Sequence, residues 1–360
     1  MIPQIEPWIT PKDQDLVNLY LKSGGWITEH KTTNIFEAEI ASYVGSRYAT
    51  MVPSGTTALY LALEALELRR KRVIVPNYTM IATINAVIAA GAQPIVADVD
   101  PKSFCLDLKK LEPCDAVIYV AINGRSDGLE KLAKKCKSSN TYLIEDACQA
   151  FGSKTDKEKY VGTIGDIGVY SFTPHKIITT GQGGAIVTNN KEVTKAIRQL
   201  KDFGRVEPGV DLHTAFGMNY KFTDLQASLG ISQLSTIEVR TSIKRDILRR
   251  YRSNLKDTRF EIPEGNCEGY VPWFVEILCK DKTDRDYVGQ VLKGKQIGSR
   301  PFYPILSTQP VFSGLNGSYL PQTNGLSNSK NISERGLWLP SSCCLEKEEI
   351  DSVCEVLKKL

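Results

Sequence analysis

Residues 116–146 show most directly how this chain folds. They begin with the apolar run Ala116-Val117-Ile118-Tyr119-Val120-Ala121-Ile122, pass through a helical stretch at 128–137, and reach a second run, Tyr142-Leu143-Ile144. Continuous apolar runs of this length are typical of strands that are buried on both faces. Strand, helix and strand at this spacing predict a βαβ unit and a mostly parallel sheet.

The same pattern continues on the N-terminal side of this stretch. Apolar runs at residues 73–75 and 94–99 are expected to add strands to the sheet. Residues 10–22 are expected to form a helix, because a threonine followed by a proline is a typical helix start. We therefore predict an α/β fold whose large domain, residues 1–245, has a mostly parallel central sheet flanked by helices.

The character of the chain changes after about residue 257. A strand pattern at residues 273–279 is followed by helical patterns at 284–292 and 346–357. This order predicts a small C-terminal α+β domain, residues 246–360.

Two other stretches carry weaker signals. Residues 225–255 follow a helical pattern, and the basic side chains on it are either a polyanion site or a solvated helix face; we favour the solvated face. Residues 307–334 are rich in Ser, Asn and Gly, which predicts a long loop of the kind that is often functional or mobile.

Composition excludes several classes of protein. The 360 residues are 42% hydrophobic and 24% charged, as in an ordinary globular protein. The net charge of +4 is too small to indicate nucleic-acid binding. Nine cysteines occur without a C-x-x-C spacing, so no zinc or other metal site is predicted. Without a signal-like or membrane-spanning apolar segment, we expect a cytoplasmic protein.

The first candidate site segment is Ser54-Gly55-Thr56, directly before a predicted helix. The free N–H groups at a helix N-terminus bind phosphate well, and glycine lets the backbone approach closely. By itself the segment is a weak signal, because Ser-Gly-Thr before a helix is more often a simple helix cap.

The second segment is Glu145-Asp146-Ala147-Cys148-Gln149, at the end of a predicted buried strand. Ligands of open α/β sheets bind at the carboxyl ends of the strands. A carboxylate at that place can keep a pyridinium nitrogen protonated, or it can simply cap the next helix.

The third segment runs from Ser171-Phe172 through Lys176 to the glycine-rich Gly181-Gln182-Gly183-Gly184. A lysine amine can bond covalently to an aldehyde and later transfer protons. A lone lysine in a loop is normally a solvated charge, but these neighbours favour a functional lysine at position 176.

In this order, the motifs Ser-Gly-Thr, Asp-x-x-Gln and Ser-Phe-x-x-x-Lys-x-x-Thr-x-Gly-x-Gly-Gly resemble the nucleotide-sugar aminotransferases of the DegT/DnrJ/EryC1/StrS family, a branch of the fold-type I pyridoxal-phosphate (PLP) enzymes. The resemblance extends from Trp26-Ile27 to Leu339-Pro340, which is nearly the whole chain. It implies a PLP cofactor that alternates with its amino form, pyridoxamine phosphate (PMP).

The resemblance also implies roles for individual residues. Lys176 would carry the cofactor covalently, Asp146 would pair with the pyridine nitrogen, and Gln149 would approach the ring hydroxyl. The phosphate would be bound by Gly55, Thr56 and Ser171. Asn219 matches a family asparagine that reaches the cofactor phosphate of a neighbouring subunit, which implies a homodimer with shared active sites.

Substrate residues follow less directly from the resemblance. Trp26, Arg300 and Tyr303 are the candidates, and Arg300 either faces the substrate diphosphate as a bidentate donor or is a structural arginine. Met80 stands where relatives usually have an aromatic residue that stacks on the PLP ring; a methionine can still pack on a flat ring. Gln182 replaces a usual glutamate.

The motif after Lys176 resembles the branch of the family that aminates C4 of 4-keto-6-deoxy sugars, and the residues near Arg300 resemble perosamine and viosamine synthases. The expected reaction transfers the amino group of L-glutamate to the C4 ketone of a nucleoside-diphosphate 4-keto-6-deoxyhexose. The alternatives are amination at C3 of a keto sugar or of a cyclitol, and a PLP-binding regulator without catalysis.

Overall fold

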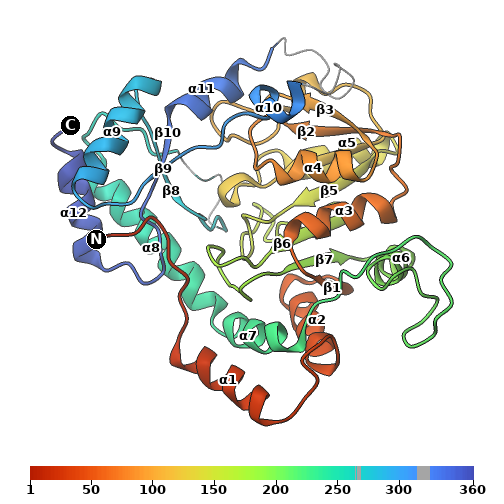
Figure 1. Ribbon diagram of the computed structural model, residues 1–360. Helices are drawn as coiled ribbons and strands as arrows, with labels where there is room; N and C mark the ends of the chain where they lie inside the picture. Colours follow the sequence, from red (N-terminus) through yellow and green to blue (C-terminus); the bar gives the residue numbers. More distant parts are fainter. Residues whose placement is uncertain (264, 266–268, 314–324) are drawn as a thin grey trace.

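The computed structural model describes residues 1–263, 265, 269–313 and 325–360 (Figure 1). Its centre is a seven-stranded sheet with the strand order β1-β7-β6-β5-β4-β2-β3. The strands are β1 (Tyr48–Val52), β2 (Arg72–Pro76), β3 (Gln93–Ala97), β4 (Ala116–Val120), β5 (Tyr142–Asp146), β6 (Ile167–Ser171) and β7 (Gly184–Thr188).

The sheet is mostly parallel, as predicted. Strands β3, β2, β4, β5 and β6 are parallel to one another, whereas β7 is antiparallel to both β1 and β6. The four predicted strands correspond to β2, β3, β4 and β5. Strands β1, β6 and β7 were not predicted from the sequence.

Helices surround the sheet, and most of them contact it directly. They are α1 (Pro11–Lys22), α2 (Lys31–Val44), α3 (Gly55–Ala65), α4 (Ala82–Ala89), α5 (Leu129–Ser138), α6 (Lys191–Leu200) and α7 (Asp224–Leu234). Helix α3 contacts β1, β6 and β7, and α4 contacts β2 and β3. Helix α1 starts as predicted, because the side chain of Thr10 accepts a hydrogen bond from the N–H of Asp13.

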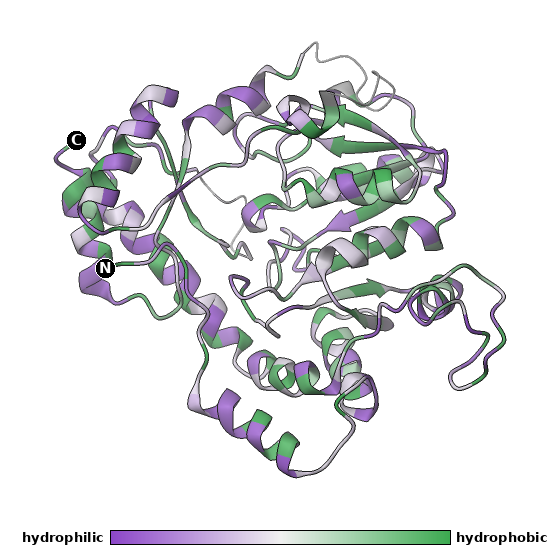
Figure 2. Cartoon of the chain, viewed as in Figure 1, coloured by the Kyte–Doolittle hydropathy of each residue, from purple (hydrophilic) through white to green (hydrophobic). Residues whose placement is uncertain are grey.

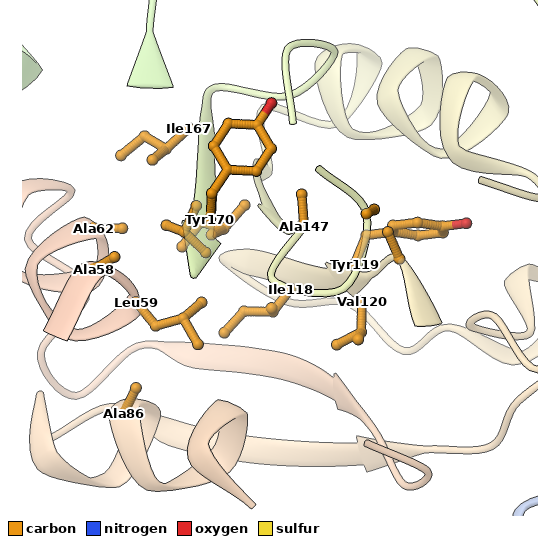
Figure 3. Packing of buried hydrophobic residues seen from close by; sticks show 14 of the residues in the cluster. Ala58, Leu59, Ala62, Ala86, Ile118, Tyr119, Val120, Ala147, Ile167 and Tyr170 are labelled. Carbon is orange, nitrogen blue, oxygen red and sulfur yellow. The ribbon is translucent and has the colours of Figure 1, made fainter. Parts of the chain in front are cut away.

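The core between helices and sheet explains the continuous apolar runs. Every residue of β4 is buried. Figure 3 shows Leu59 of α3 and Ala86 of α4 on one side of Ile118, with Tyr170 of β6 also in the cluster. Figure 2 shows the same division, with hydrophobic central strands and outer helices of mixed polarity. Burial of apolar side chains from both layers is the main stabilising contribution.

The C-terminal part has its own small sheet and its own core. Strands β8 (Val275–Leu278), β10 (Gly336–Leu339) and β9 (Arg300–Pro301) are antiparallel, in that order. Around them lie α8 (Ile237–Leu255), α9 (Lys282–Gly294), α11 (Ser327–Arg335) and α12 (Lys347–Leu357) (Figure 1). A second apolar cluster, which includes Tyr251, Val288 and Val353, fills the space between them. The proposed boundary at 245/246 falls within α8 and stays a prediction.

The structure corrects two expectations about irregular stretches. The helical pattern at 225–255 forms two helices, α7 and α8, and the solvated-face interpretation is wrong for Lys244, which is buried and donates to the carbonyl of Ser341. The predicted loop at 307–334 contains the short helix α10 (Pro310–Ser313) and most of α11, and its residues 314–324 lie outside the described part. None of the described helices is long and apolar enough to cross a membrane.

Candidate active site

The carboxyl ends of β5 and β6 and the N-terminus of α3 meet at a cavity of about 250 Å³. Nine of the residues predicted for the site line this cavity: Gly55, Thr56, Met80, Asp146, Gln149, Ser171, Lys176, Arg300 and Tyr303. Gly55 and Tyr303, the two that lie farthest apart in the sequence, are 248 positions apart, and the sheet topology brings them together. Asn219 and Trp26 do not line it.

The N-terminus of α3 has both features that its sequence suggests. Ser54 caps the helix, since its side chain accepts a hydrogen bond from the N–H of Thr57 at 3.1 Å. Gly55 begins the helix where a side chain would not fit: a Cβ would lie 2.7 Å from Sγ of Cys148 and 3.0 Å from Cβ of Ser171. The absence of a side chain thus keeps the backbone of this helix end next to β6.

Asp146 ends β5 and is 6% exposed. Its Oδ2 accepts a hydrogen bond from the hydroxyl of Thr83 at 2.9 Å, and its Oδ1 accepts one from the N–H of Cys148 at 3.2 Å. Gln149 follows on the same turn, and its Oε1 accepts the N–H of Asn123 at 2.8 Å. A buried carboxylate is thus fixed at the carboxyl end of a central strand, where the cavity opens.

Lys176 lies in the loop between β6 and β7. Its Nζ is 3.8 Å from the ring centroid of Trp273, which comes from the segment just before β8. Burial lowers the pKa of Lys176 to about 8, although the nearby Cys148 and Asp146 act in the opposite direction. A lysine with a lowered pKa has a larger neutral fraction near pH 7 and is a better nucleophile.

The neighbouring His175 also lines the cavity. Burial lowers the pKa of His175 to about 4, and the positive charges of Lys176 and Arg300 act in the same direction. Its ring is therefore neutral at physiological pH. It lies 5.5 Å from the ring of Trp273.

Two of the three candidate substrate residues lie at the cavity, and the third does not. Arg300 and Tyr303 lie at the cavity, with the guanidinium 5.5 Å from the Tyr303 ring centroid. Met80 is 43% exposed at the same cavity. Trp26 is 69% exposed, away from the cavity, so the structure does not bring it to the site of its own chain.

Asn219 is exposed, and its Oδ1 accepts the N–H of Lys221. Within this chain it is not part of the cavity. Sequence reasoning missed Thr83, Asn123 and Trp273, which contact predicted site residues. Single polar or aromatic residues far along the chain carry no local signal, so no motif could have identified them.

Comparison with known proteins identifies the family. The model of the DegT/DnrJ/EryC1/StrS aminotransferase family matches residues 7–358. The chain belongs to this family. The prediction made from its three motifs is confirmed, and with it the prediction of a PLP-dependent aminotransferase.

Individual relatives agree with this assignment. The GDP-perosamine synthase of Escherichia coli O157:H7 is 33% identical over 365 residues, which cover 99% of this chain and 98% of the relative. The GDP-perosamine synthase of Vibrio cholerae is 30% identical over 367 residues, with 99% and 98% coverage. The solved structure of the aminotransferase TlmJ from Streptoalloteichus hindustanus superposes with a TM-score of 0.91 at 26% identity, covering 100% of this chain and 98% of that one. The predicted fold class is confirmed as well.

The cavity residues fit PLP. The cofactor needs a phosphate site, an anion for its pyridine nitrogen and an amine for covalent attachment. The close approach at Gly55 leaves the N–H groups of the α3 N-terminus next to Ser171, which suits a phosphate. The buried carboxylate of Asp146 and the amine of Lys176 supply the other two requirements within the same cavity.

Proposed function

We propose that this enzyme transfers the amino group of L-glutamate to the C4 ketone of a nucleoside-diphosphate 4-keto-6-deoxyhexose, giving a 4-amino-4,6-dideoxy sugar nucleotide of the perosamine or viosamine type. The observation that carries the proposal is the joint presence of Lys176, Asp146 and Arg300 around one cavity. The two relatives that bear the name GDP-perosamine synthase, aligned over nearly their full length, support this class of substrate.

Bound PLP supplies an electron sink that stabilises negative charge next to the transferred nitrogen. We assign the phosphate to Gly55, Thr56 and Ser171 at the positive end of helix α3. Asp146 would keep the pyridine nitrogen protonated, because a buried carboxylate favours a nearby cation. Gln149 would lie at the ring hydroxyl.

Lys176 would hold the cofactor and move the proton that the transfer requires, since its Nζ can both donate and accept near neutral pH. Met80 would pack on the exposed ring face. At the open side of the cavity, Arg300 would pair with the diphosphate of the sugar nucleotide, as its guanidinium offers paired N–H donors. Tyr303, which lies under Arg300, would border the sugar.

The first test is a single half-reaction. The purified protein is loaded with PLP and mixed with L-glutamate alone, and the 2-oxoglutarate released is quantified. We expect about one equivalent per active site, because no acceptor is present to regenerate PLP. Release of no 2-oxoglutarate would reject glutamate as the donor.

The second test identifies the acceptor. GDP-, UDP- and dTDP-linked 4-keto-6-deoxyhexoses are each incubated with enzyme and glutamate, and the products are separated by chromatography. Nuclear magnetic resonance of the product then locates the new amine. An amine at C4 supports the proposal; an amine at C3, or turnover only with a cyclitol ketone, would replace it with one of the alternatives.

We further propose a homodimer in which Asn219 serves the site of the other subunit. Support comes from large apolar side chains exposed on and near the loop that carries it: Leu212 is 57%, Phe216 87% and Met218 47% exposed. Apolar exposure of this extent is typical of an interaction surface. Light scattering during gel filtration would give the oligomeric state, and a monomer that retains activity would contradict this proposal.

We also propose a cytoplasmic location. The eight cysteines in the described part of the chain are all free thiols, and four of them are buried. Free thiols persist in a reducing compartment. Fractionation of cells that express the protein would test the location.

A further inference from the structure

The indole ring of Trp273 covers the amine of Lys176. Nζ lies 3.8 Å from the ring centroid, well inside the distance of about 6 Å at which a cation is attracted to an aromatic face. Trp273 itself is 1% exposed. Nζ makes no hydrogen bond or ion pair with the residues that the structure describes, so the ring face is its main contact for positive charge.

The orientation of the indole is fixed by two further contacts. Its Nε1 donates a hydrogen bond of 2.7 Å to the carbonyl of His175, the residue that directly precedes Lys176 in the chain. The ring of Phe274 stacks on the indole, with ring centroids 3.9 Å apart and planes 25° from parallel. The ring cannot turn away from the lysine without breaking the hydrogen bond.

Asn123 forms hydrogen bonds both with the segment that contains Trp273 and Phe274 and with Gln149, a predicted cofactor residue. Its Oδ1 accepts the N–H of Phe274 at 2.7 Å, and its Nδ2 donates to the carbonyl of Phe274 at 2.9 Å. Its own N–H donates to Oε1 of Gln149. Asn123 therefore connects the segment that carries Trp273 to Gln149.

Other groups near Nζ also affect its charge. Asp146 and Cys148 attract the ammonium, and both contribute to its pKa. Asp146 already accepts hydrogen bonds from Thr83 and from the N–H of Cys148. His175 is neutral, and burial favours the uncharged amine. Contact with the aromatic face acts in the same direction as Asp146 and Cys148, since a ring face also favours the cation.

We propose that Trp273 is a positioning residue that holds the free Lys176 ammonium against its ring face in those forms of the enzyme in which Nζ is not bonded to the cofactor. The contact keeps the nitrogen beside the reacting centre and preserves the protonated form that must return a proton. This inference deepens the proposed function and rests on Lys176 as the cofactor lysine. It does not depend on which sugar is the acceptor.

The test measures the protonation of Lys176 itself. The protein is loaded with PMP, which leaves Nζ free, and its amines are labelled with trace acetic anhydride at a series of pH values. Mass spectrometry of the peptide that contains Lys176 then gives the pH at which labelling is half-maximal. Loading with PMP directly makes this readout independent of donor and acceptor, so a failed half-reaction with glutamate would reject the proposed function and leave this test intact.

Two substitutions and one control separate the possible roles. Trp273→Met removes the ring but fills much of its volume, and we expect the apparent pKa of Lys176 to fall by about 0.4 to 1.5 units, the equivalent of one cation–π contact. Trp273→Phe keeps a weaker ring, and a smaller fall is expected. The control Trp338→Phe alters the same aromatic cluster, 6.1 Å from Trp273, without touching Lys176, and should leave the pKa unchanged.

A pKa that stays constant in Trp273→Met would overturn the proposal. A pKa that rises would also overturn it, because it would mean that the indole acts only by excluding water. Circular dichroism establishes that each variant is folded. Should Trp273→Met fail to fold, Trp273→Phe decides: a measurable fall supports the proposal, and no fall overturns it.

Discussion

Glu145 and Asp146 are consecutive residues of β5, and their carboxylates have entirely different partners. The carboxylate of Glu145 accepts the N–H groups of Gly162, Ile164 and Gly165 at 2.5–2.6 Å. That of Asp146 accepts the hydroxyl of Thr83 and lines the cavity. Successive residues of a strand point to opposite faces, so one acid of the pair anchors a loop and the other is left for the ligand.

Asp146→Asn should therefore reduce PLP affinity, whereas Glu145→Gln should reduce stability. Asp146→Asn is expected to weaken PLP binding about 10- to 150-fold, because a hydrogen bond to a charged group contributes about 1.5–3 kcal/mol. Glu145→Gln places an amide N–H₂ against a backbone N–H and should reduce the free energy of unfolding by about 1–3 kcal/mol. Cofactor titration and urea unfolding of both variants measure the two effects. An equal loss of PLP affinity in both would contradict the separation of roles.

Lys176→Ala should abolish transamination while PLP still binds noncovalently, because the other cofactor residues are unchanged. Borohydride reduction followed by peptide mass spectrometry should find cofactor attached to Lys176 in the native enzyme and to no residue in the variant. Lys71→Ala, a change of an exposed lysine paired with Asp115, is the control and should retain the modification. Substantial turnover by Lys176→Ala would remove this lysine from the mechanism.

Gly55→Ala should weaken PLP binding and lower stability by about 1–3 kcal/mol, because the new Cβ would overlap Sγ of Cys148 at 2.7 Å. The combination with Cys148→Ala removes the closest clash and should recover part of the loss. Gly294→Ala, whose Cβ would meet nothing within 4 Å, is a matched control at another helical glycine and should be at least as stable as the native protein. Thermal unfolding and PLP titration of the four proteins measure both effects. Without any recovery in the double variant, Cys148 would not be the limiting contact.

His175 should make stability depend on pH between about 4 and 6.5. Its pKa is lowered from 6.5 in the unfolded chain to about 4 in the folded one, so the folded state favours the neutral ring. The resulting stability is fully present above pH 6.5 and is lost as the pH falls towards 4. Compared with His175→Asn, the native protein should lose of the order of 1 kcal/mol more between pH 7.5 and 5, since solvent screens part of the effect. Urea unfolding of both proteins at the two pH values tests this; parallel pH curves would mean that the ring titrates normally.

Much of the large α/β part could be predicted because its signals are local. Continuous apolar runs such as residues 116–122 became β4, and the cap at Thr10 started α1 where expected. Strands β6 and β7 were not predicted. They flank the motif around Lys176, and the residues there were interpreted as a binding site and not as secondary structure. Lys244 was misjudged for a related reason: a basic residue on a helix is usually solvated, and only packing against the segment at Ser341 buries it.

The sequence by itself determined the α/β class and the family and supplied the candidate residues for PLP, because motif order and apolar periodicity are properties of neighbouring residues. Only the tertiary structure decided which residues complete the site. Thr83 beside Asp146, Asn123 beside Gln149 and Trp273 over Lys176 are brought together by sheet order and by the docking of the C-terminal segment. Contacts between residues so far apart in the chain depend on packing and leave no periodic or local pattern to detect.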